Sequence, residues 1–285
     1  MLDLENLAGL PLALDDSGLL VFGAGIVIED HGERLLDALT PVVLEPERTR
    51  GSVEVAYYMD NGVYRRADES RLAGVPMRYE LTLIPPRQIG REFVKTFGHR
   101  HRPEPKSGLD WAEVCEVLVG TAHFLMQTLD LSGPDASVVY LVEAKAGQKV
   151  LLPPGFDHCT INPGPEPLLF SDVIARGVSG IYDRFVATRG AAYLEVAEGS
   201  LPPPAGDLRP RKPRDLRHFV PNPTYRRVPP LTRVELRDYP HLGLTSQVPL
   251  YKAFIESRGQ QWSFLTDPTL FYATFPDLRA IFDAA

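Results

Sequence analysis

Three histidines and one glutamate have the residue types and spacing of a metal-binding set. His99 and His101 are two residues apart, so on one β-strand both imidazoles would point to the same face. His158 follows a Pro-Pro-Gly turn at 153–155, which would return the chain to the first pair. Glu113 would add a carboxylate as fourth ligand. Imidazole and carboxylate together suit a divalent first-row ion, so the set predicts bound Fe, Mn, Ni or Zn.

This donor set predicts a catalytic metal site rather than a structural one. Four protein ligands on an ion that prefers five or six leave positions open for substrate oxygens. We expect one divalent ion per chain, Fe²⁺ ahead of Mn²⁺, Ni²⁺ or Zn²⁺. Two other glutamates are alternatives to Glu113 as the fourth ligand. Glu116 is three residues further along, so on a strand it would point to the opposite face from Glu113, and Glu104 lies among prolines. A His-x-His pair alone is more often a surface or core feature, and the later Pro-x-Gly-x-x-His pattern favours the ligand interpretation.

The composition of the 285-residue chain narrows the class of protein. A hydrophobic content of 44% is ordinary for a globular protein. The net charge of −7 argues against nucleic-acid binding, and no apolar run approaches the ~20 residues of a membrane helix. Two cysteines do not make a disulfide framework, and the acidic N-terminal residues lack the basic segment of a signal peptide. We therefore expect a cytoplasmic protein that binds neither membrane nor nucleic acid.

Three stretches of different composition divide the chain. Residues 1–50 are mixed and predict an N-terminal arm packed on a core found elsewhere. Residues 51–200 hold short β-rich runs separated by glycine and proline, which favours an all-β sandwich or barrel, with a jelly roll as the natural candidate. Residues 201–285 begin with a proline-rich basic linker, followed by a helix near 248–256 and several aromatic residues. We expect this C-terminal extension to dock on the barrel or on a neighbouring chain.

The second histidine motif resembles that of the cupins, whose fold is a double-stranded β-helix or jelly-roll barrel. Five positions match the cupin spacing: Gly147, Pro153, Gly155, His158 and Asn162. The first motif matches less closely, because eleven residues separate His101 from Glu113 where cupins usually have far fewer. The excess at 102–108 predicts a loop insertion. The resemblance implies that residues 51–200 form a cupin barrel.

A longer stretch resembles one family in particular, the cupin-type glucose-6-phosphate isomerases. The resemblance runs from about Ala56 to Val186, and its most specific segments are 79–101, 112–127 and 153–162. It implies that the metal is held by His99, His101, Glu113 and His158. It also implies that the substrate phosphate is held by Thr82, Thr96 and the backbone at Gly98. Glu113 is the family candidate for the catalytic base, and Tyr182 lies near the position of an active-site aromatic residue.

The residues around the first motif suit an anionic substrate. Five basic residues within 87–102 are opposed only by Glu92, although the whole chain is acidic: Arg87, Arg91, Lys95, Arg100 and Arg102. The hydroxyls of Thr82 and Thr96 and the N–H of Gly98, where no Cβ blocks approach, would suit phosphate oxygens. Among the cations, we expect Lys95 to take part in substrate binding. Each arginine could instead lie on a solvent-exposed strand face and have no part in substrate binding.

The clearest departure from the family is Cys115, two residues after Glu113, where many members carry tyrosine. A thiol cannot replace a phenol in a hydrogen bond to a sugar hydroxyl, so activity or ring-form preference would differ. We expect no nucleophilic role for Cys115, and we expect Cys159 to point away from the metal. For His123 the better interpretation is a hydrogen-bonded core histidine.

Three functions remain open at this point. The resemblance implies a metal-dependent aldose–ketose isomerase that interconverts glucose 6-phosphate and fructose 6-phosphate in glycolysis and gluconeogenesis. One alternative is a cupin dioxygenase with the same ligands, which would not need a phosphate-binding set. The other is a non-catalytic cupin that binds a sugar phosphate. The resemblance also implies a homodimer.

Overall fold

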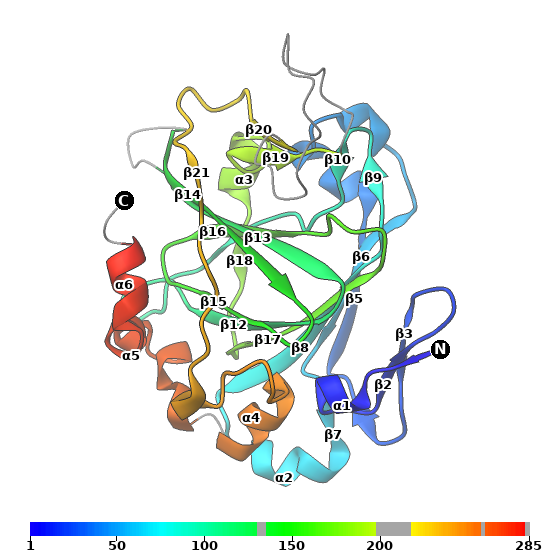
Figure 1. Cartoon of the computed structure of the whole chain (residues 1–285), viewed down its shortest axis with the longest axis vertical. Helices are drawn as coiled ribbons and strands as arrows, with labels where there is room; N and C mark the ends of the chain where they lie inside the picture. The colour runs from blue at the N-terminus through cyan, green and yellow to red at the C-terminus, as the bar shows by residue number, and fades with distance from the viewer. Residues whose placement is uncertain (130–134, 198–217, 258–259, 283–285) are drawn as a thin grey trace.

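Two antiparallel sheets share one hydrophobic core in the computed structural model of the chain (Figure 1). The larger sheet has the strand order β15-β12-β17-β8-β6-β5, and the smaller one has the order β16-β13-β14-β21. Neighbouring strands are antiparallel except β14 and β21, which are parallel. The structure describes residues 1–129, 135–197, 218–257 and 260–282. This arrangement confirms the predicted fold class, an all-β cupin jelly roll.

The larger sheet consists of β5 (Asp30–Leu35), β6 (Val55–Asn61), β8 (Met77–Ile84), β12 (Glu113–Val119), β15 (Lys149–Leu152) and β17 (Leu168–Ala175). The smaller sheet consists of β13 (Thr121–Leu129), β14 (Ala136–Lys145), β16 (Asp157–Ile161) and β21 (Leu231–Arg233). Shorter strands pair outside these sheets: β1 (Leu2–Asp3), β2 (Leu12–Leu14) and β3 (Leu20–Phe22); β4 (Ile26–Val27) and β7 (Tyr64–Arg65); β9 (Gln88–Ile89) and β10 (Glu92–Phe93); β11 (Arg100–His101) and β18 (Gly180–Ile181); β19 (Tyr193–Glu195) and β20 (Phe219–Pro221).

The helices are short. The α-helices of the described residues are α1 (Glu5–Ala8), α2 (Glu69–Leu72), α3 (Asp183–Ala187), α4 (Leu250–Ser257), α5 (Phe271–Thr274) and α6 (Pro276–Phe282). The 3₁₀ helices there are η1 (Leu36–Val42), η2 (Pro46–Arg48), η3 (Arg66–Asp68), η5 (Pro240–Leu242), η6 (Gln260–Leu265) and η7 (Pro268–Leu270). Within the described part of the chain, no helix has the length and apolar character needed to cross a membrane.

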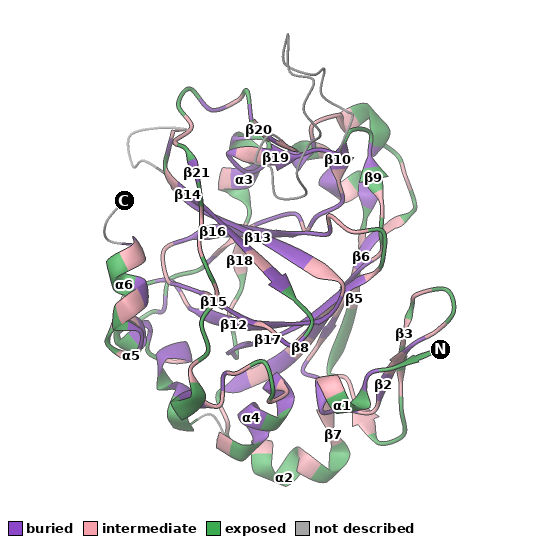
Figure 2. Ribbon diagram, viewed as in Figure 1, coloured by how far each residue is buried: buried purple, intermediate pink, exposed green. Residues whose placement is uncertain are grey.

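The strand sequences explain which faces are buried. In β8, Tyr79 and Leu81 are buried, whereas the alternate residues Arg78, Glu80 and Thr82 are partly exposed and face the other side. In β12 and β17 every residue is buried, because both faces of these strands are covered (Figure 2). The alternation in β8 therefore turns three polar side chains toward the interior of the barrel.

The C-terminal extension contacts both sheets: it adds β21 to the smaller sheet, where Phe282 of α6 also packs against Tyr140 of β14, and it covers part of the larger sheet. Its helix α4 lies close to the predicted range and packs against β17. The ring of Tyr251 in α4 meets that of Tyr79 edge-on, with a centroid distance of 5.3 Å. Four of the aromatic residues expected to dock are fully buried: Trp262, Phe264, Phe271 and Phe275. The extension thus packs on the barrel of its own chain.

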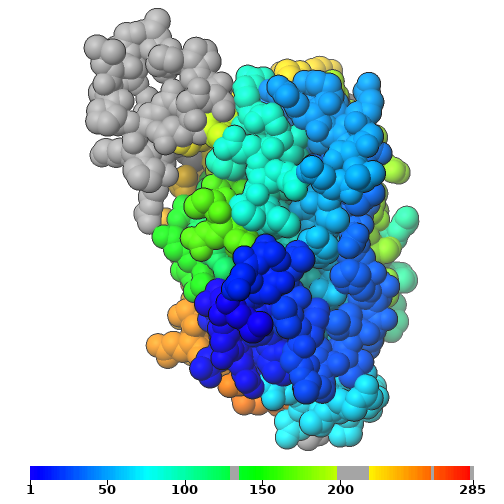
Figure 3. Space-filling model, turned by 90° about the vertical axis from the view of Figure 1, so that its right-hand side faces the viewer, coloured from blue at the N-terminus to red at the C-terminus, as the bar shows by residue number. Residues whose placement is uncertain are grey.

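Residues before position 51 cover one side of the molecule, shown in blue in Figure 3. Their longest strand, β5, pairs with β6 and forms the edge of the larger sheet, where Arg34 lies opposite Tyr57. The predicted division into parts at residues 50 and 200 stays a prediction. Much of the proline-rich linker, 198–217, lies outside the described residues, and β20 and β21 follow it.

Candidate active site

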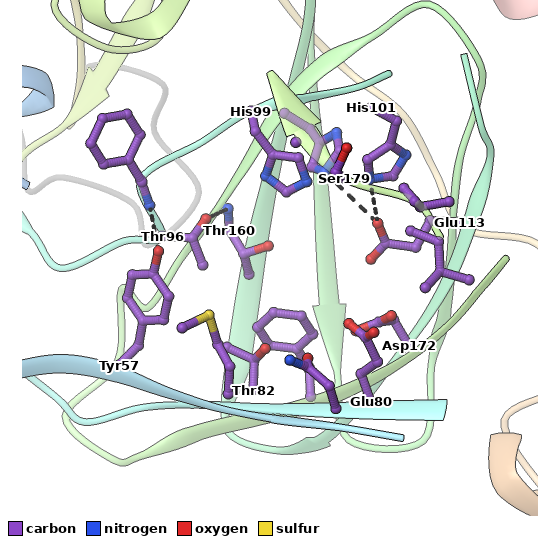
Figure 4. A pocket seen from close by; sticks show the side chains of 18 of the residues that line it. Tyr57, Glu80, Thr82, Thr96, His99, His101, Glu113, Thr160, Asp172 and Ser179 are labelled. Atoms are coloured by element: carbon purple, nitrogen blue, oxygen red, sulfur yellow. Dashed lines mark hydrogen bonds and ion pairs between the residues drawn. The ribbon is translucent and has the colours of Figure 1, made fainter. Parts of the chain in front are cut away.

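Backbone pairing brings the three predicted histidine ligands together. His99 and His158 form an antiparallel bridge, with reciprocal N–H···O bonds of 3.0 and 2.8 Å. His101 is in β11, which pairs with β18. The ligand nitrogens of the three imidazoles lie within 4.8 Å of one another (Figure 4). The centroids of the three rings are 4.5–5.1 Å apart. This histidine triad can therefore hold one metal ion.

The nitrogen of His101 that faces Glu113 has no hydrogen-bond partner. Because a carbonyl oxygen only accepts, Nδ1 of His101 donates to the carbonyl of Trp111, at 2.9 Å. In the neutral ring Nε2 then carries a lone pair; it is buried, unbonded, and 3.3 Å from Oε2 of Glu113. Two unprotonated acceptors at that distance repel each other, and a bound cation, like a proton on Nε2, would remove the repulsion. The donor set therefore fits a divalent ion.

Burial keeps His99 and His158 in the neutral form that binds metal ions. It lowers the pKa of His99 well below its ordinary value and that of His158 to about 4, and the other imidazoles add to the effect. Burial also opposes protonation of His101, but the Glu113 carboxylate outweighs it and raises the pKa of His101. Burial opposes ionisation of Glu113, and the adjacent imidazoles outweigh it and lower the pKa of that carboxyl. Glu113 is therefore held as the carboxylate, which is the form that binds a cation.

The two competing glutamates lie elsewhere. Glu116 is buried on the other side of β12, where its Oε1 accepts a hydrogen bond from Nζ of Lys149 at 2.6 Å. Glu104 lies in the loop insertion and accepts a hydrogen bond from a backbone N–H of that loop. Glu113 is therefore the glutamate that the fold brings to the histidines.

A cavity of about 390 Å³ opens beside the histidine triad, and strand register orders the side chains on its floor. One row across the sheet contains Met59, Thr82 and Phe170. The next row, two residues and about 7 Å along the strands, contains Asn61, Glu80 and Asp172. The histidines lie across the cavity from this floor (Figure 4). A substrate in the cavity would lie between the two.

One end of the cavity has the groups that bind an anion. Thr82 and Thr96 line it, and Oγ1 of Thr96 accepts from the Thr160 N–H at 3.0 Å, which leaves its own O–H for a ligand. Arg34 of β5 reaches the same cavity and lies 6.0 Å from the centre of the Phe97 ring. It forms no ion pair with a described residue, and its buried Nε has no hydrogen-bond partner. The sequence motifs gave no signal for Arg34, because it lies far upstream of them.

The other two predicted phosphate contacts, Lys95 and Gly98, are not among the residues that line the cavity. Lys95 lies outside the cavity, buried and paired with Glu92. Neighbouring residues of an extended segment point to opposite sides, and Thr96 takes the cavity side. Gly98 has a φ of +83°, and a Cβ there would overlap the ring of Phe185. The glycine is therefore required by backbone conformation and packing; it is absent from the cavity lining, although its N–H makes no hydrogen bond to a described residue.

Tyr182 lies at the mouth of the cavity. Its ring centroid is 5.7 Å from that of His99 and 5.4 Å from that of Phe97. The pairing of β18 with β11 holds it there, and Gly180 makes room, since a Cβ at that position would be 2.9 Å from Cζ of Tyr182. Tyr182 is 37% exposed, so part of its ring meets solvent while the ring also packs against His99.

Neither cysteine lines the cavity. Cys115 is buried and donates a hydrogen bond to Oε1 of Glu113 at 2.9 Å, and burial raises the pKa of its thiol well above the ordinary value. Burial raises the pKa of Cys159 to about 12. Neither thiol is therefore an activated nucleophile. His123 also lies outside the cavity, where its Nδ1 is 2.8 Å from the carboxylate of Glu195, as expected for a core histidine.

Two carboxyl groups on the cavity floor were not predicted from the sequence, because neither lies in a recognisable motif. Glu80 and Asp172 lie opposite each other on β8 and β17, and Glu80 is paired with Arg78. Burial raises the pKa of Glu80 to about 7 and that of Asp172 well above its ordinary value, and the Glu113 carboxylate adds to both shifts. The alternation of polar and apolar residues along β8 was the one available indication for Glu80, because it puts Glu80 on the same face as Thr82.

Comparison with known proteins gives one family. A family model described as glucose-6-phosphate isomerase (GPI) matches residues 34–204. Curated relatives include the glucose-6-phosphate isomerases of Thermococcus litoralis, 34% identical, and Pyrococcus abyssi, 30% identical, each over 122 residues. Each match covers 43% of this chain and 58% of the relative, so the chain spans little more than half the length of these relatives.

Solved structures overlap with the chain in part. Oxalate oxidase in complex with glycolate matches with a TM-score of 0.27 and 15% identity, over 35% of this chain and 41% of that one. A variant of oxalate decarboxylase from B. subtilis matches with a TM-score of 0.31 and 15% identity, over 59% of this chain and 35% of that one.

Proposed function

Because the chain belongs to the glucose-6-phosphate isomerase family, we propose that it is a metal-dependent aldose–ketose isomerase. Its substrates would be glucose 6-phosphate and fructose 6-phosphate, which places it in glycolysis and gluconeogenesis. One observation carries the proposal: a single cavity has the histidine triad on one wall and, at its end, two threonine hydroxyls and the guanidinium of Arg34, which forms no ion pair with a described residue. That arrangement suits a substrate with a carbonyl at one end and a phosphate at the other.

The proposed ion is held by His99, His101, His158 and Glu113. A bound divalent ion supplies Lewis acidity, which polarises the oxygens on C1 and C2 of the sugar. Fe²⁺ is our first choice, and Mn²⁺, Ni²⁺ and Zn²⁺ are the alternatives, because imidazole and carboxylate bind all four. The unbonded Nε2 of His101 facing the Glu113 carboxylate supports this assignment.

The proposed phosphate site consists of Thr82, Thr96 and Arg34. The two hydroxyls donate hydrogen bonds to phosphate oxygens, and the guanidinium supplies positive charge and further N–H donors. We keep the N–H of Gly98 as a proposed further donor, because it makes no hydrogen bond to a described residue and its neighbours Phe97 and His99 line the cavity, although Gly98 itself does not. Anchoring the phosphate here directs the other end of the sugar toward the histidines.

The proposed catalytic base is Glu113, which takes a proton from C2 and returns it to C1. The Cys115 thiol donates to its Oε1, while its Oε2 faces His101. A carboxylate next to a cation is a weaker base, so direct hydride movement between the two carbons is the competing route. Tyr182, the other proposed catalytic-site residue, packs against His99 at the cavity mouth. Deuterium uptake from solvent at C1 or C2 would support Glu113, and its complete absence would support the hydride route.

The proposal is tested by a coupled assay for glucose 6-phosphate formation from fructose 6-phosphate. The protein is chelated and reloaded separately with Fe²⁺, Mn²⁺, Ni²⁺ or Zn²⁺, and His158→Ala serves as the control with an impaired site. We expect metal-dependent turnover that continues without oxygen. Binding of fructose 6-phosphate without turnover under every metal would instead support a non-catalytic binding protein, and turnover that needs oxygen would support a dioxygenase. The expected homodimer is tested separately by light scattering.

A further inference from the structure

Asp172 is a buried carboxyl group without a partner. It is 5% exposed, and no described residue donates a hydrogen bond to it or forms an ion pair with it. It lies directly opposite Glu80, although like charges facing each other across strands destabilise a sheet. A buried carboxyl group that lacks hydrogen bonds costs free energy, so Asp172 does not stabilise the barrel. A residue that breaks a local rule in this way is a candidate for ligand binding.

The position of Asp172 shows which ligand group it would meet. It lies on the cavity floor, across from the histidines and close to Glu113 (Figure 4). Its neighbour Glu80 is engaged by Arg78, so Asp172 is the acceptor left free in this row. A carboxyl group offers oxygen acceptors in both protonation states, and its natural partner is a hydroxyl donor. Oε2 of Glu113 lies 3.3 Å from Nε2 of His101 and 3.8 Å from Nε2 of His158, whereas neither Asp172 nor Glu80 forms an ion pair with a histidine among the described residues, so we leave both out of the proposed metal set.

We propose that Asp172 accepts a hydrogen bond from a hydroxyl group of the substrate's carbon chain and is a specificity-determining residue. The inference rests on the proposed function and deepens it. With the phosphate bound at the Thr82 end and the carbonyl end at the histidines, the hydroxyls next to the carbonyl would lie over Asp172, which is on the floor close to Glu113 (Figure 4). The cavity would therefore select a polyhydroxylated sugar phosphate over a phosphorylated chain that lacks the contacted hydroxyl.

The test combines a variant series with a substrate series. Asp172→Val keeps a similar size and a β-branched shape but removes the acceptor, and Asp172→Asn keeps a neutral acceptor oxygen. Each metal-loaded protein is assayed with fructose 6-phosphate and with analogues that lack the hydroxyl at C3, C4 or C5. For Asp172→Val we expect kcat/KM for fructose 6-phosphate to fall about 10- to 100-fold, with unchanged metal content and an equal or higher Tm. Asp172→Asn should lose less.

The substrate series distinguishes recognition from a structural role. For one analogue, wild type and Asp172→Val should have similar kcat/KM values, because removal of either partner breaks the same hydrogen bond. The matched control is Asp60→Asn, since Asp60 is a buried carboxylate on β6 that bonds to His31 outside the cavity. An unchanged kcat/KM in Asp172→Val, a loss of the same factor for every analogue, or a lower Tm would overturn the inference. If the wild type has no turnover, the proposed function fails, and the same comparison made on Kd still tests Asp172.

Discussion

Replacing Arg34 by methionine removes a cation of the cavity while keeping a long side chain. Of the two arginines that line the cavity, Arg78 is paired with Glu80, whereas Arg34 has no ion-pair partner among the described residues. A sugar phosphate would therefore be its counter-ion. We expect Arg34→Met to weaken binding of fructose 6-phosphate far more than it changes metal content.

The magnitude follows from the position of the guanidinium. Arg34 is half-buried, so its interaction with a phosphate lies between the limits for water and for a dry interior. Hydrogen bonds to charged groups contribute about 1.5–3 kcal/mol net. At about 1.4 kcal/mol per factor of ten, Arg34→Met should raise KM about 10- to 100-fold. Arg34→Lys should recover part of this, because it restores the charge but not the planar set of donors.

The assay is steady-state isomerisation of fructose 6-phosphate by metal-loaded protein. The matched control is Arg87→Met, since Arg87 is a surface arginine paired with Glu54 outside this cavity. For unphosphorylated fructose the difference between wild type and Arg34→Met should disappear. The reasoning is refuted if KM for fructose 6-phosphate stays within twofold of wild type, or if Arg87→Met raises it equally.

Three further changes test other parts of the structure. His158→Ala should abolish metal retention and activity together, and full activity with normal metal content would contradict the ligand assignment. Thr96→Val should raise KM for the sugar phosphate about 10-fold or more and lower stability by about 1 kcal/mol, because Thr96 also accepts the Thr160 N–H; an unchanged KM would remove it from the phosphate site. Burial raises the pKa of Glu116 to about 7, so its proton is held more tightly in the folded state than in the unfolded state. In chelated protein the protonated Glu116 should therefore add up to about 3 kcal/mol to the free energy of unfolding below about pH 4.5. This contribution should be lost as pH rises to about 7. Glu116→Gln should show a flatter pH dependence in chemical denaturation, and an identical slope would argue against the shift.

The clustering of the three histidines was predictable because the information for it is local. The residues His99 and His101 share a face by strand geometry, and Pro153 to His158 carries the turn that returns the chain. Glu113 was harder to assign from the sequence, since the loop insertion increases its distance from His101 along the chain. The structure brings it to the histidines because β12 begins at that residue.

The walls of the cavity were less predictable because they depend on pairing between distant strands. The sequence singled out Lys95 as the substrate cation, yet it is buried against Glu92, and Arg34 reaches the cavity instead. Arg34 lies there because β5 joins the edge of the sheet and pairs with β6. Asp172 faces the cavity because the register of β17 sets it opposite Glu80.

Residue identity and spacing over short distances were enough to predict the candidate ligand types, the β-strand content and the family. Which cation and which carboxyl group line the cavity follows from the tertiary structure alone. A one-residue change in the exposed face of an extended segment moves a side chain from the cavity to the core. That choice is made by long-range strand pairing and by the packing of the C-terminal extension on both sheets, neither of which is encoded in any short motif.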